Sequence, residues 1–295
     1  MRYRVCDPHR ISSFWVCPPT YYDVRVLDIK SYGVMRQTFS LLKNSFCLFW
    51  ITGFMTISMA DITEGLVGYW PLDDSVKDEV GKHDGKLEGG AKFVKDADRG
   101  QVLEVNGENT IDGGKAIVPH ADDLSFAITD SYSLSVWVKA IALPGHWAGI
   151  VNKSRDQEPW YGLWLDDSNR WCFGGENIFG STPKTKRWYH VVLVQDAEAK
   201  ERLSYVDNKK DIKGGDPIEA SGGGDLWFGG ANCCAFAEQF HGRIDDVAIF
   251  NRALSEKEIP DAGEIVQMLP VQLKGKLTTT WAKIRQSPAN LRRPE

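Results

Sequence analysis

The chain has 295 residues, a net charge of −5 and 42% hydrophobic residues. Such a chain can form one large β domain or two smaller domains with full cores. Residues 1–60 carry seven Lys or Arg and three Asp or Glu, a net of +4, which leaves −9 for the remainder. An acidic remainder disfavours nucleic acid as a partner, because phosphate binding requires a surplus of cations.

Residues 44–58 form the most apolar run of the chain and have the order of a secretory signal. Lys43 precedes the run, and Ser58-Met59-Ala60 ends it with the small residues of a cleavage site. The run is shorter than the roughly 20 residues that span a membrane. We therefore predict a signal peptide and a secreted, extracellular or cell-surface protein, without a membrane span in the mature chain. An uncleaved anchor and a buried core segment are the alternatives.

A signal normally begins near the start of a chain, whereas this one begins near Met35. Residues 1–34 show neither the alternation of strands nor the period of a helix. We predict that 1–34 are an extension from a misplaced start and that 35–60 are the signal peptide. Residues 61–265 would then form the domain and 266–295 a C-terminal tail.

Short alternating apolar runs separated by Gly, Asp and Asn follow one another from residue 65 onward. About a dozen such runs with no long helical period predict an all-β fold of antiparallel sheets. The predicted strands are Gly65–Leu72, Lys86–Val94, Gln101–Asn106, Lys115–Val118, Tyr132–Ala140, Ala148–Lys153, Tyr161–Leu165, Arg170–Phe173, Trp188–Gln195, Arg202–Val206, Leu226–Gly229 and Gly242–Phe250.

Two of these predicted strands, and the segment that follows the last strand, allow more specific predictions. In Tyr132–Ala140 the alternation predicts one core face and one face with Trp137 among polar groups. Trp188–Gln195 is apolar on both faces, which indicates a central strand. Ser255 and Glu258 have the spacing of a capping box and predict a short C-terminal helix, limited by Pro260.

Five segments follow one another in a characteristic order: Gly65-Leu-Val-Gly-Tyr-Trp-Pro-Leu-Asp73, His83-Asp84-Gly85, Ser133-Leu-Ser-Val-Trp137-Val-Lys139, Trp188-Tyr-His190-Val-Val, and the run from Gly242 to Ile259. Together they resemble the laminin-G-like and concanavalin-A-like jelly-roll family. The resemblance implies a two-sheet antiparallel jelly-roll sandwich with a curved face. It also implies carbohydrate binding, protein binding or adhesion, sometimes with calcium, and one fold serves many of these functions.

The cysteines that follow the signal are Cys172, Cys233 and Cys234. Export would place them in an oxidising compartment, and an odd number allows at most one bridge. Cys172 paired with Cys233 or Cys234 is one prediction, and a vicinal Cys233–Cys234 ring is the alternative.

Aspartates gather near the first and last predicted strands, which are often neighbours in a sandwich. Asp73, Asp78 and Asp84 follow the first strand, and Asp245 and Asp246 lie in the last. Calcium prefers such oxygen ligands, so these residues are a candidate metal site with Ca²⁺ as its cofactor. Aspartate also favours turns, because its side chain hydrogen-bonds to the nearby backbone. An equally weighted alternative is that these aspartates are turn residues and not metal ligands.

Aromatic residues concentrate in one stretch of the chain. Indole rings stack on the C–H faces of sugars while Asp and Asn bind hydroxyls, which indicates a glycan site. Core packing is the favoured alternative for each single tryptophan, and we expect one or two of them to be exposed. Trp188, Trp227 and a buried His190 are assigned to the core. The candidate ligand-binding residues are Trp147, Trp160, Trp164, Asp166, Trp171 and Asn177.

The last prediction concerns catalysis. The sequence has no Glu-x-Asp-x-x-Glu and no Gly-x-Ser-x-Gly, and the adjacent Asp245 and Asp246 should point to opposite faces of a strand. We therefore predict that the chain is not an enzyme but a secreted binding module for glycan or adhesion. A protein-binding or scaffold module is the first alternative and a glycoside hydrolase the second.

Overall fold

The computed structural model describes residues 61–107, 113–154, 159–175, 177–233 and 236–269. The predicted signal peptide, the extension before it and the tail beyond residue 269 lie outside the described residues, so export stays a prediction. Among the described residues, no helix is long and apolar enough to cross a membrane.

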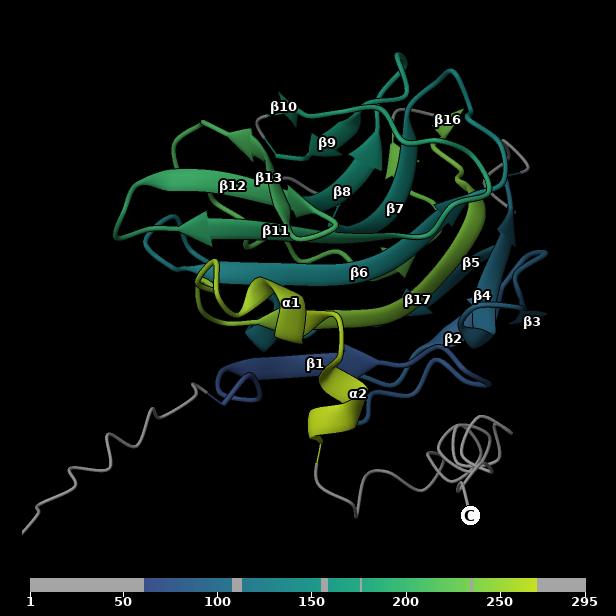
Figure 1. The fold of residues 1–295 in the computed structure, drawn as a ribbon, viewed down its shortest axis with the longest axis horizontal. Helices are drawn as coiled ribbons and strands as arrows, with labels where there is room; N and C mark the ends of the chain where they lie inside the picture. Colours follow the sequence, from purple (N-terminus) through teal and green to yellow (C-terminus); the bar gives the residue numbers. More distant parts are fainter. Residues whose placement is uncertain (1–60, 108–112, 155–158, 176, 234–235, 270–295) are drawn as a thin grey trace, which may run out of the picture. The chain divides into compact units, whose positions relative to one another are not determined.

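The described residues form two large antiparallel sheets, one small hairpin and three short helical turns (Figure 1). The strands are β1 Leu66–Trp70, β2 Lys86–Glu88, β3 Lys92–Asp96, β4 Gly100–Asn106, β5 Lys115–Val118, β6 Tyr132–Ala140, β7 Ala148–Lys153, β8 Tyr161–Leu165, β9 Trp171–Phe173, β10 Ile178–Phe179, β11 Tyr189–Asp196, β12 Glu201–Val206, β13 Lys209–Lys213, β14 Leu226–Phe228, β15 Asn232–Cys233, β16 Phe236–Ala237 and β17 His241–Phe250. The helical turns are η1 Asp122–Leu124, α1 Ile259–Ala262 and α2 Ile265–Met268.

The eight-stranded sheet has the order β13-β12-β11-β6-β17-β4-β3, with β1 also paired to β17. The seven-stranded sheet has the order β10-β9-β8-β7-β14-β5-β2. The predicted two-sheet jelly-roll sandwich is therefore confirmed. The central place predicted for the strand from Trp188 is also confirmed, because β11 lies between β12 and β6.

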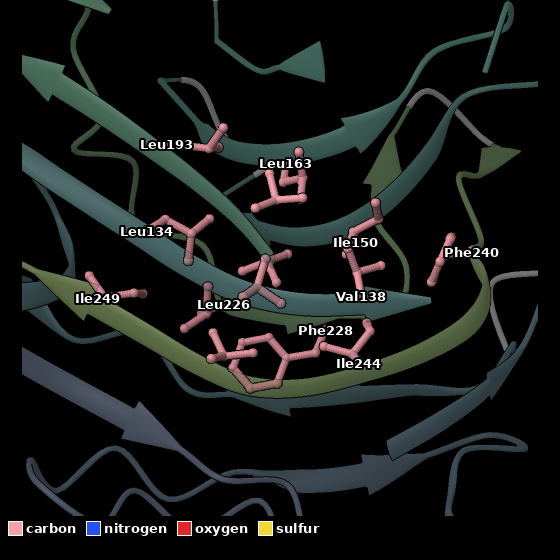
Figure 2. Close-up of a cluster of buried hydrophobic side chains, with 14 of the residues drawn as sticks. Leu134, Val138, Ile150, Leu163, Leu193, Leu226, Phe228, Phe240, Ile244 and Ile249 are labelled. Carbon is pink, nitrogen blue, oxygen red and sulfur yellow. The ribbon is translucent and has the colours of Figure 1, made fainter. Parts of the chain in front are cut away.

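The inner faces of the two sheets meet in one hydrophobic core. Leu134, Leu193 and Ile249 of the eight-stranded sheet point toward Ile150 and Leu163 of the seven-stranded sheet (Figure 2). Leu226 and Phe228 of β14 lie in the same cluster and are fully buried. The alternation in β6 is as predicted: Tyr132, Leu134, Val136 and Val138 are in this core.

The predicted strand Lys86–Val94 is two strands that belong to different sheets. β2 pairs with β5 in the seven-stranded sheet, whereas β3 pairs with β4 in the eight-stranded sheet. Gly89 and Gly90 lie between them, and Gly89 has a φ of 59°. The chain changes sheets here because glycine adopts this left-handed conformation without steric cost.

The outer face of the eight-stranded sheet carries a second hydrophobic cluster with α1 and α2. Tyr69, Val192 and Tyr205 of the sheet pack there with Ile259 of α1 and Ile265 of α2. His190 lies beneath α1 and is 3% exposed, and its Nε2 is 2.8 Å from Ser135 Oγ. This agrees with its assignment as a buried histidine. Trp188 and Trp227 are only partly buried, so their assignment to the core is wrong.

The capping residues Ser255 and Glu258 meet as predicted, but the helix starts later than expected. Glu258 Oε2 accepts hydrogen bonds from Ser255 N at 2.9 Å and from Ser255 Oγ at 2.7 Å. These bonds close a turn, and α1 begins after it at Ile259. Pro260 lies in the first turn of α1, where its missing N–H would have no helical partner in any case.

Glu258 should stabilise the fold at neutral pH, and this contribution to the free energy of unfolding should be lost in acid. Burial raises the pKa of Glu258, but Arg252 and Ser255 outweigh it and lower the pKa to about 2. Because the folded pKa lies below the unfolded value, this contribution is present above about pH 4.3 and is lost as the pH falls toward 2. Glu258→Gln should reduce the free energy of unfolding at pH 7 by about 2 kcal/mol, and by much less near pH 2.5.

Urea denaturation at the two pH values measures this difference. The exposed neighbour Glu256 provides the control, and Glu256→Gln should change the free energy of unfolding by less than about 0.5 kcal/mol. An equal loss for Glu258→Gln at both pH values would contradict the assignment.

Candidate functional site

The outer face of the seven-stranded sheet carries a cluster of tryptophans. In β8, Leu163 and Leu165 enter the core, so Trp164 between them faces the other way. Trp160 packs edge-on against Trp164 with ring centroids 4.7 Å apart, and the partly buried Trp147 joins them. The structure thus brings together three of the predicted ligand-binding tryptophans.

Two glycines let these rings lie against the backbone of the sheet. A Cβ atom at Gly174 would lie 2.2 Å from Trp160 Cζ3, and one at Gly162 would lie 2.9 Å from Trp164 Cζ3. Both distances are shorter than any ordinary contact, so larger residues would lift the rings off the sheet. This close packing explains why Trp160 is only 8% exposed and Trp164 only 1% exposed.

Part of the same face is covered by the segment that leads into and out of the β15–β16 hairpin. Asn152 Nδ2 donates to the Gly230 carbonyl, and Gly149 N donates to the Glu238 carbonyl at 2.8 Å. Trp164 Nε1 donates to Glu238 Oε2 at 3.2 Å. Asn152 and Ser154, which form an Asn-x-Ser glycosylation sequence, are both buried and are closed to modification in the folded domain.

A hollow opens beside the exposed part of Trp160. Its volume is about 480 Å³, which is in the range of small-molecule sites. Ile128 is 53% exposed at its edge, and Glu219 supplies a carboxylate. The lining residues are Ile128, Pro159, Trp160, Gly175, Pro217, Ile218 and Glu219.

The wall of the hollow is held by hydrogen bonds between one strand and two irregular segments. Gln195 at the end of β11 accepts from Ile218 N at 3.0 Å and donates to the Ile218 carbonyl at 3.1 Å. Glu219 Oε2 accepts from Ile128 N at 3.3 Å. The result is a largely apolar wall with one carboxylate, an arrangement that suits a ligand with both C–H and hydroxyl surfaces.

A second aromatic group lies at the sheet edge formed by β10. Phe179 is 40% exposed, and its ring centroid is 6.2 Å from that of Trp147. The Arg170 guanidinium lies 4.3 Å from the centre of the Phe179 ring. Arg170 and Phe179 thus form a cation–π pair at this edge of the sheet.

Sequence reasoning missed most of the hollow: of the six predicted ligand residues Trp160 lines it, and the other five do not. Trp171 packs in the core, with its ring 5.7 Å from that of Tyr189, so it cannot face a ligand. Asp166 is 1% exposed and holds the β8–β9 turn through bonds to Arg170 and Ser168. Asn177 is exposed just before β10. The missed residues Ile128, Pro217 and Ile218 lie in irregular segments, where no periodic pattern marks them.

The predicted metal ligands form two groups, each with protein partners. Asp78 is buried and accepts hydrogen bonds from the backbone of Tyr69, Val80 and Gly81 and from His83 Nδ1 at 2.8 Å. Asp84 Oδ1 accepts from Asp78 N at 2.9 Å. These contacts organise the turn after β1, as the turn alternative predicts.

Asp245 and Asp246 belong to the other group and share Arg99. Arg99 Nε donates to Asp245 Oδ2 at 2.7 Å, and Arg99 Nη2 donates to Asp246. The prediction that these adjacent carboxylates face opposite ways is wrong. A β-bulge follows Asp245, and Asp246 has a φ of 47°, so both side chains reach the same arginine.

Tyr69 separates the two groups, because its N–H bonds Asp78 while its hydroxyl donates to Asp246. Asp73 is partly buried near the second group. Among the described residues, no three His, Cys, Asp or Glu side chains are grouped so that they could hold a metal ion. Calcium binding at Asp73, Asp78, Asp84, Asp245 and Asp246 stays a prediction without support from this geometry.

The predicted disulfide also stays a prediction. Cys172 is buried on the outer side of β9 within the tryptophan cluster. Cys233 lies in β15, and Cys234 lies outside the described residues.

A family model described as the concanavalin A-like lectin/glucanases superfamily (Laminin_G_3) matches residues 112–260, half of the chain. The chain belongs to this superfamily. The match includes β6 to β17 and all residues of the hollow. Comparison with curated proteins gives no match.

Solved structures share the fold of this superfamily member at low sequence identity. Domain 4 of a GH43 extracellular arabinanase from Geobacillus stearothermophilus, in complex with arabinotriose, has a TM-score of 0.53 at 19% identity, over 67% of this chain and 97% of that one. The binding domain of Paraclostridial Mosquitocidal Protein 1 has a TM-score of 0.55 at 16% identity, over 70% of this chain and 53% of that one. A Trypanosoma rangeli sialidase mutant with trans-sialidase activity has a TM-score of 0.51 at 20% identity, over 67% of this chain and 32% of that one.

These structures contradict the prediction that the chain is not an enzyme. Domains of the same fold occur in chains named as an arabinanase and as sialidases. The missing Glu-x-Asp-x-x-Glu pattern excludes one arrangement of carboxylates on one strand, and it does not separate enzymes from binding proteins within this superfamily.

The pair formed by Asp245 and Asp246 generates a prediction about stability. Burial raises the pKa of Asp245 well above its usual range, the Asp246 carboxylate raises it further, and Arg99 opposes both effects. Arg99→Leu would leave two buried carboxylates without their cation, and it should lower the free energy of unfolding by about 3–5 kcal/mol at pH 7. Arg187→Leu, which breaks the exposed pair with Asp207, should cost less than about 1 kcal/mol.

The same variant should show a matching pH dependence. Because the pKa of Asp245 is raised in the folded state, the folded state binds protons more readily than the unfolded state. The free energy of unfolding therefore falls as the pH rises from the unfolded pKa toward the folded pKa. Lowering the pH from 7 to 5, or adding Asp245→Asn, should therefore restore part of the stability of Arg99→Leu. Urea denaturation measures these effects, and a loss for Arg99→Leu no greater than that for Arg187→Leu would refute the role of Arg99.

Proposed function

We propose that this domain binds a carbohydrate in the hollow beside Trp160. The observation that carries the proposal is the combination of the Trp160 indole and two proline rings with the Glu219 carboxylate in a hollow of about 480 Å³. A sugar ring has apolar C–H faces and a rim of hydroxyls. It therefore matches a wall in which stacking surfaces and a hydrogen-bond acceptor lie side by side.

The similar structures support this class of ligand. The arabinanase domain covered over 97% of its length is described in complex with arabinotriose. A Trypanosoma rangeli sialidase, of which 32% is matched, is described in complex with sialic acid. Because identity is near 20%, these relatives make a glycan the first class of ligand to test, and they leave the choice of sugar open.

Binding should depend on the residues of the hollow. Glu219→Gln should weaken glycan binding about tenfold, because a charge-assisted hydrogen bond to a hydroxyl becomes a neutral one. Ile128→Asp should weaken it by a similar factor, because it places a charge on the apolar edge. A glycan array that includes arabinotriose would identify the ligand for the full chain, and isothermal titration calorimetry would compare the variants.

Met268 provides the matched control, because it is an exposed apolar residue that does not line the hollow. Met268→Ala should bind the selected glycan with unchanged affinity. Binding that is equal in the wild type, Glu219→Gln and Ile128→Asp would place the ligand elsewhere. A wild-type chain that binds no glycan on the array would refute the proposal.

A further inference from the structure

The loop between Ile218 and β14 forms part of the wall of the hollow and is tied to the opposite wall. Glu219 lines the hollow, and three residues later Gly222 N donates to the Pro159 carbonyl at 2.9 Å. Pro159 also lines the hollow and directly precedes Trp160. The position of Gly222 therefore determines how the Glu219 side and the Trp160 side of the hollow face each other.

The carbonyl groups of this loop bind a buried lysine at the end of β7. Lys153 is fully buried, and its Nζ donates to the Gly222 carbonyl at 3.0 Å and to the Gly224 carbonyl at 2.6 Å. Ser154 Oγ accepts from Gly224 N at 3.0 Å and adds a second tie to the loop. A buried ammonium group held by several acceptors fixes their geometry, because any displacement would leave a buried charge with fewer hydrogen bonds.

A further acceptor of Lys153 is a titratable side chain. His120 Nδ1 lies 2.9 Å from Lys153 Nζ, and His120 Nε2 lies 3.2 Å from Asp122 Oδ1. An ammonium group has only donors, so His120 Nδ1 must offer its lone pair and Nε2 must carry the proton. A second proton on His120 would point an N–H at Nζ and place two cations in contact.

The charged groups that face His120 come from several elements. Lys153 of β7 faces Nδ1, Asp122 of η1 faces Nε2, and Asp225 Oδ1 accepts from His120 N at 2.9 Å. Lys86 of β2 interacts with Asp225. A second proton on His120 would break its contact with Lys153 at Nδ1, whereas the backbone bond of His120 to Asp225 in the loop would remain.

We propose that Lys153 and His120 are positioning residues that form a pH-sensitive latch on the wall of the hollow. With neutral His120, Lys153 holds Gly222 and Gly224, and Gly222 holds Pro159. Protonation of His120 replaces its hydrogen bond with Lys153 by a repulsion between two cations, which weakens this arrangement and loosens the loop that carries Glu219. The role in ligand binding rests on the proposed function, whereas the latch itself is a property of the domain without ligand.

Hydrogen exchange of the Gly222 amide in the full chain, measured by NMR without glycan, tests the latch directly. The protection factor of this amide should fall at least tenfold between pH 7.5 and pH 5, because its bond to Pro159 depends on the latch. The Ile218 amide, which bonds Gln195, provides an internal control and should keep its protection factor.

His120→Asn is the matched variant, because its side-chain carbonyl can still accept from Lys153 but does not titrate. It should keep the Gly222 protection factor at both pH values. An unchanged protection factor in the wild type would overturn the latch. So would the same fall in His120→Asn, because the fall would then come from another group.

Calorimetry with the glycan chosen on the array links the latch to binding. Wild-type affinity should fall about tenfold between pH 7.5 and pH 5, and His120→Asn should keep its affinity. Equal pH dependence in both proteins would overturn the role of the latch in binding. If the wild type binds no glycan at either pH, the proposed function fails, and the exchange of Gly222 still decides whether the latch exists.

Discussion

The packing of two sheets through their inner faces is the constraint on which the remaining structure depends. Every strand has two faces, and the core takes one face of each sheet, so recognition uses the outer faces, the edges and the connecting segments. The two outer faces differ. On the eight-stranded sheet α1 and α2 cover a second apolar cluster, whereas on the seven-stranded sheet tryptophans lie on glycine-rich backbone beside a hollow.

Charged side chains on the eight-stranded sheet have a structural part in this division. Arg99 lies between β3 and β4, yet it bonds Asp245 and Asp246 in β17 and stacks on Trp137 of β6 at 4.2 Å. Asp96, at the end of β3, pairs with Lys139 and Arg243. Asp245 and Asp246, which the sequence offers as metal ligands, are thus paired with an arginine side chain that joins neighbouring strands.

The sequence predicts the strands well, because alternation directly reflects which residues are buried. Tyr132–Ala140 has the bounds of β6, and Tyr161–Leu165 has those of β8. β13 was not predicted, because it is a Lys-rich edge strand with little apolar alternation, as edge strands often are. Helix α1 begins after the predicted cap, since the Ser255–Glu258 bonds close a separate turn first.

The candidate site was less predictable, because it depends on contacts between segments that are far apart in the chain. The tryptophan pattern indicates a cluster near Trp160, but it gives no means of distinguishing the inward Trp171 from the outward Trp164 before the strand bounds are known. Pro217 and Glu219 are held at the hollow by the bonds of Ile218 with Gln195 and of Glu219 with Ile128. Similarly, the common orientation of Asp245 and Asp246 results from a bulge that no residue pattern announces.

The place of β17 has a consequence for how the chain acquires its structure. β17 is the last strand of the described chain, yet it pairs with β1, β4 and β6 within the eight-stranded sheet. During synthesis, β1 therefore has no hydrogen-bonded neighbour in the large sheets until residues 241–250 have left the ribosome. Such distant pairings slow folding and leave strand edges exposed for longer. The eight-stranded sheet therefore cannot be completed around β1 until its closing segment emerges.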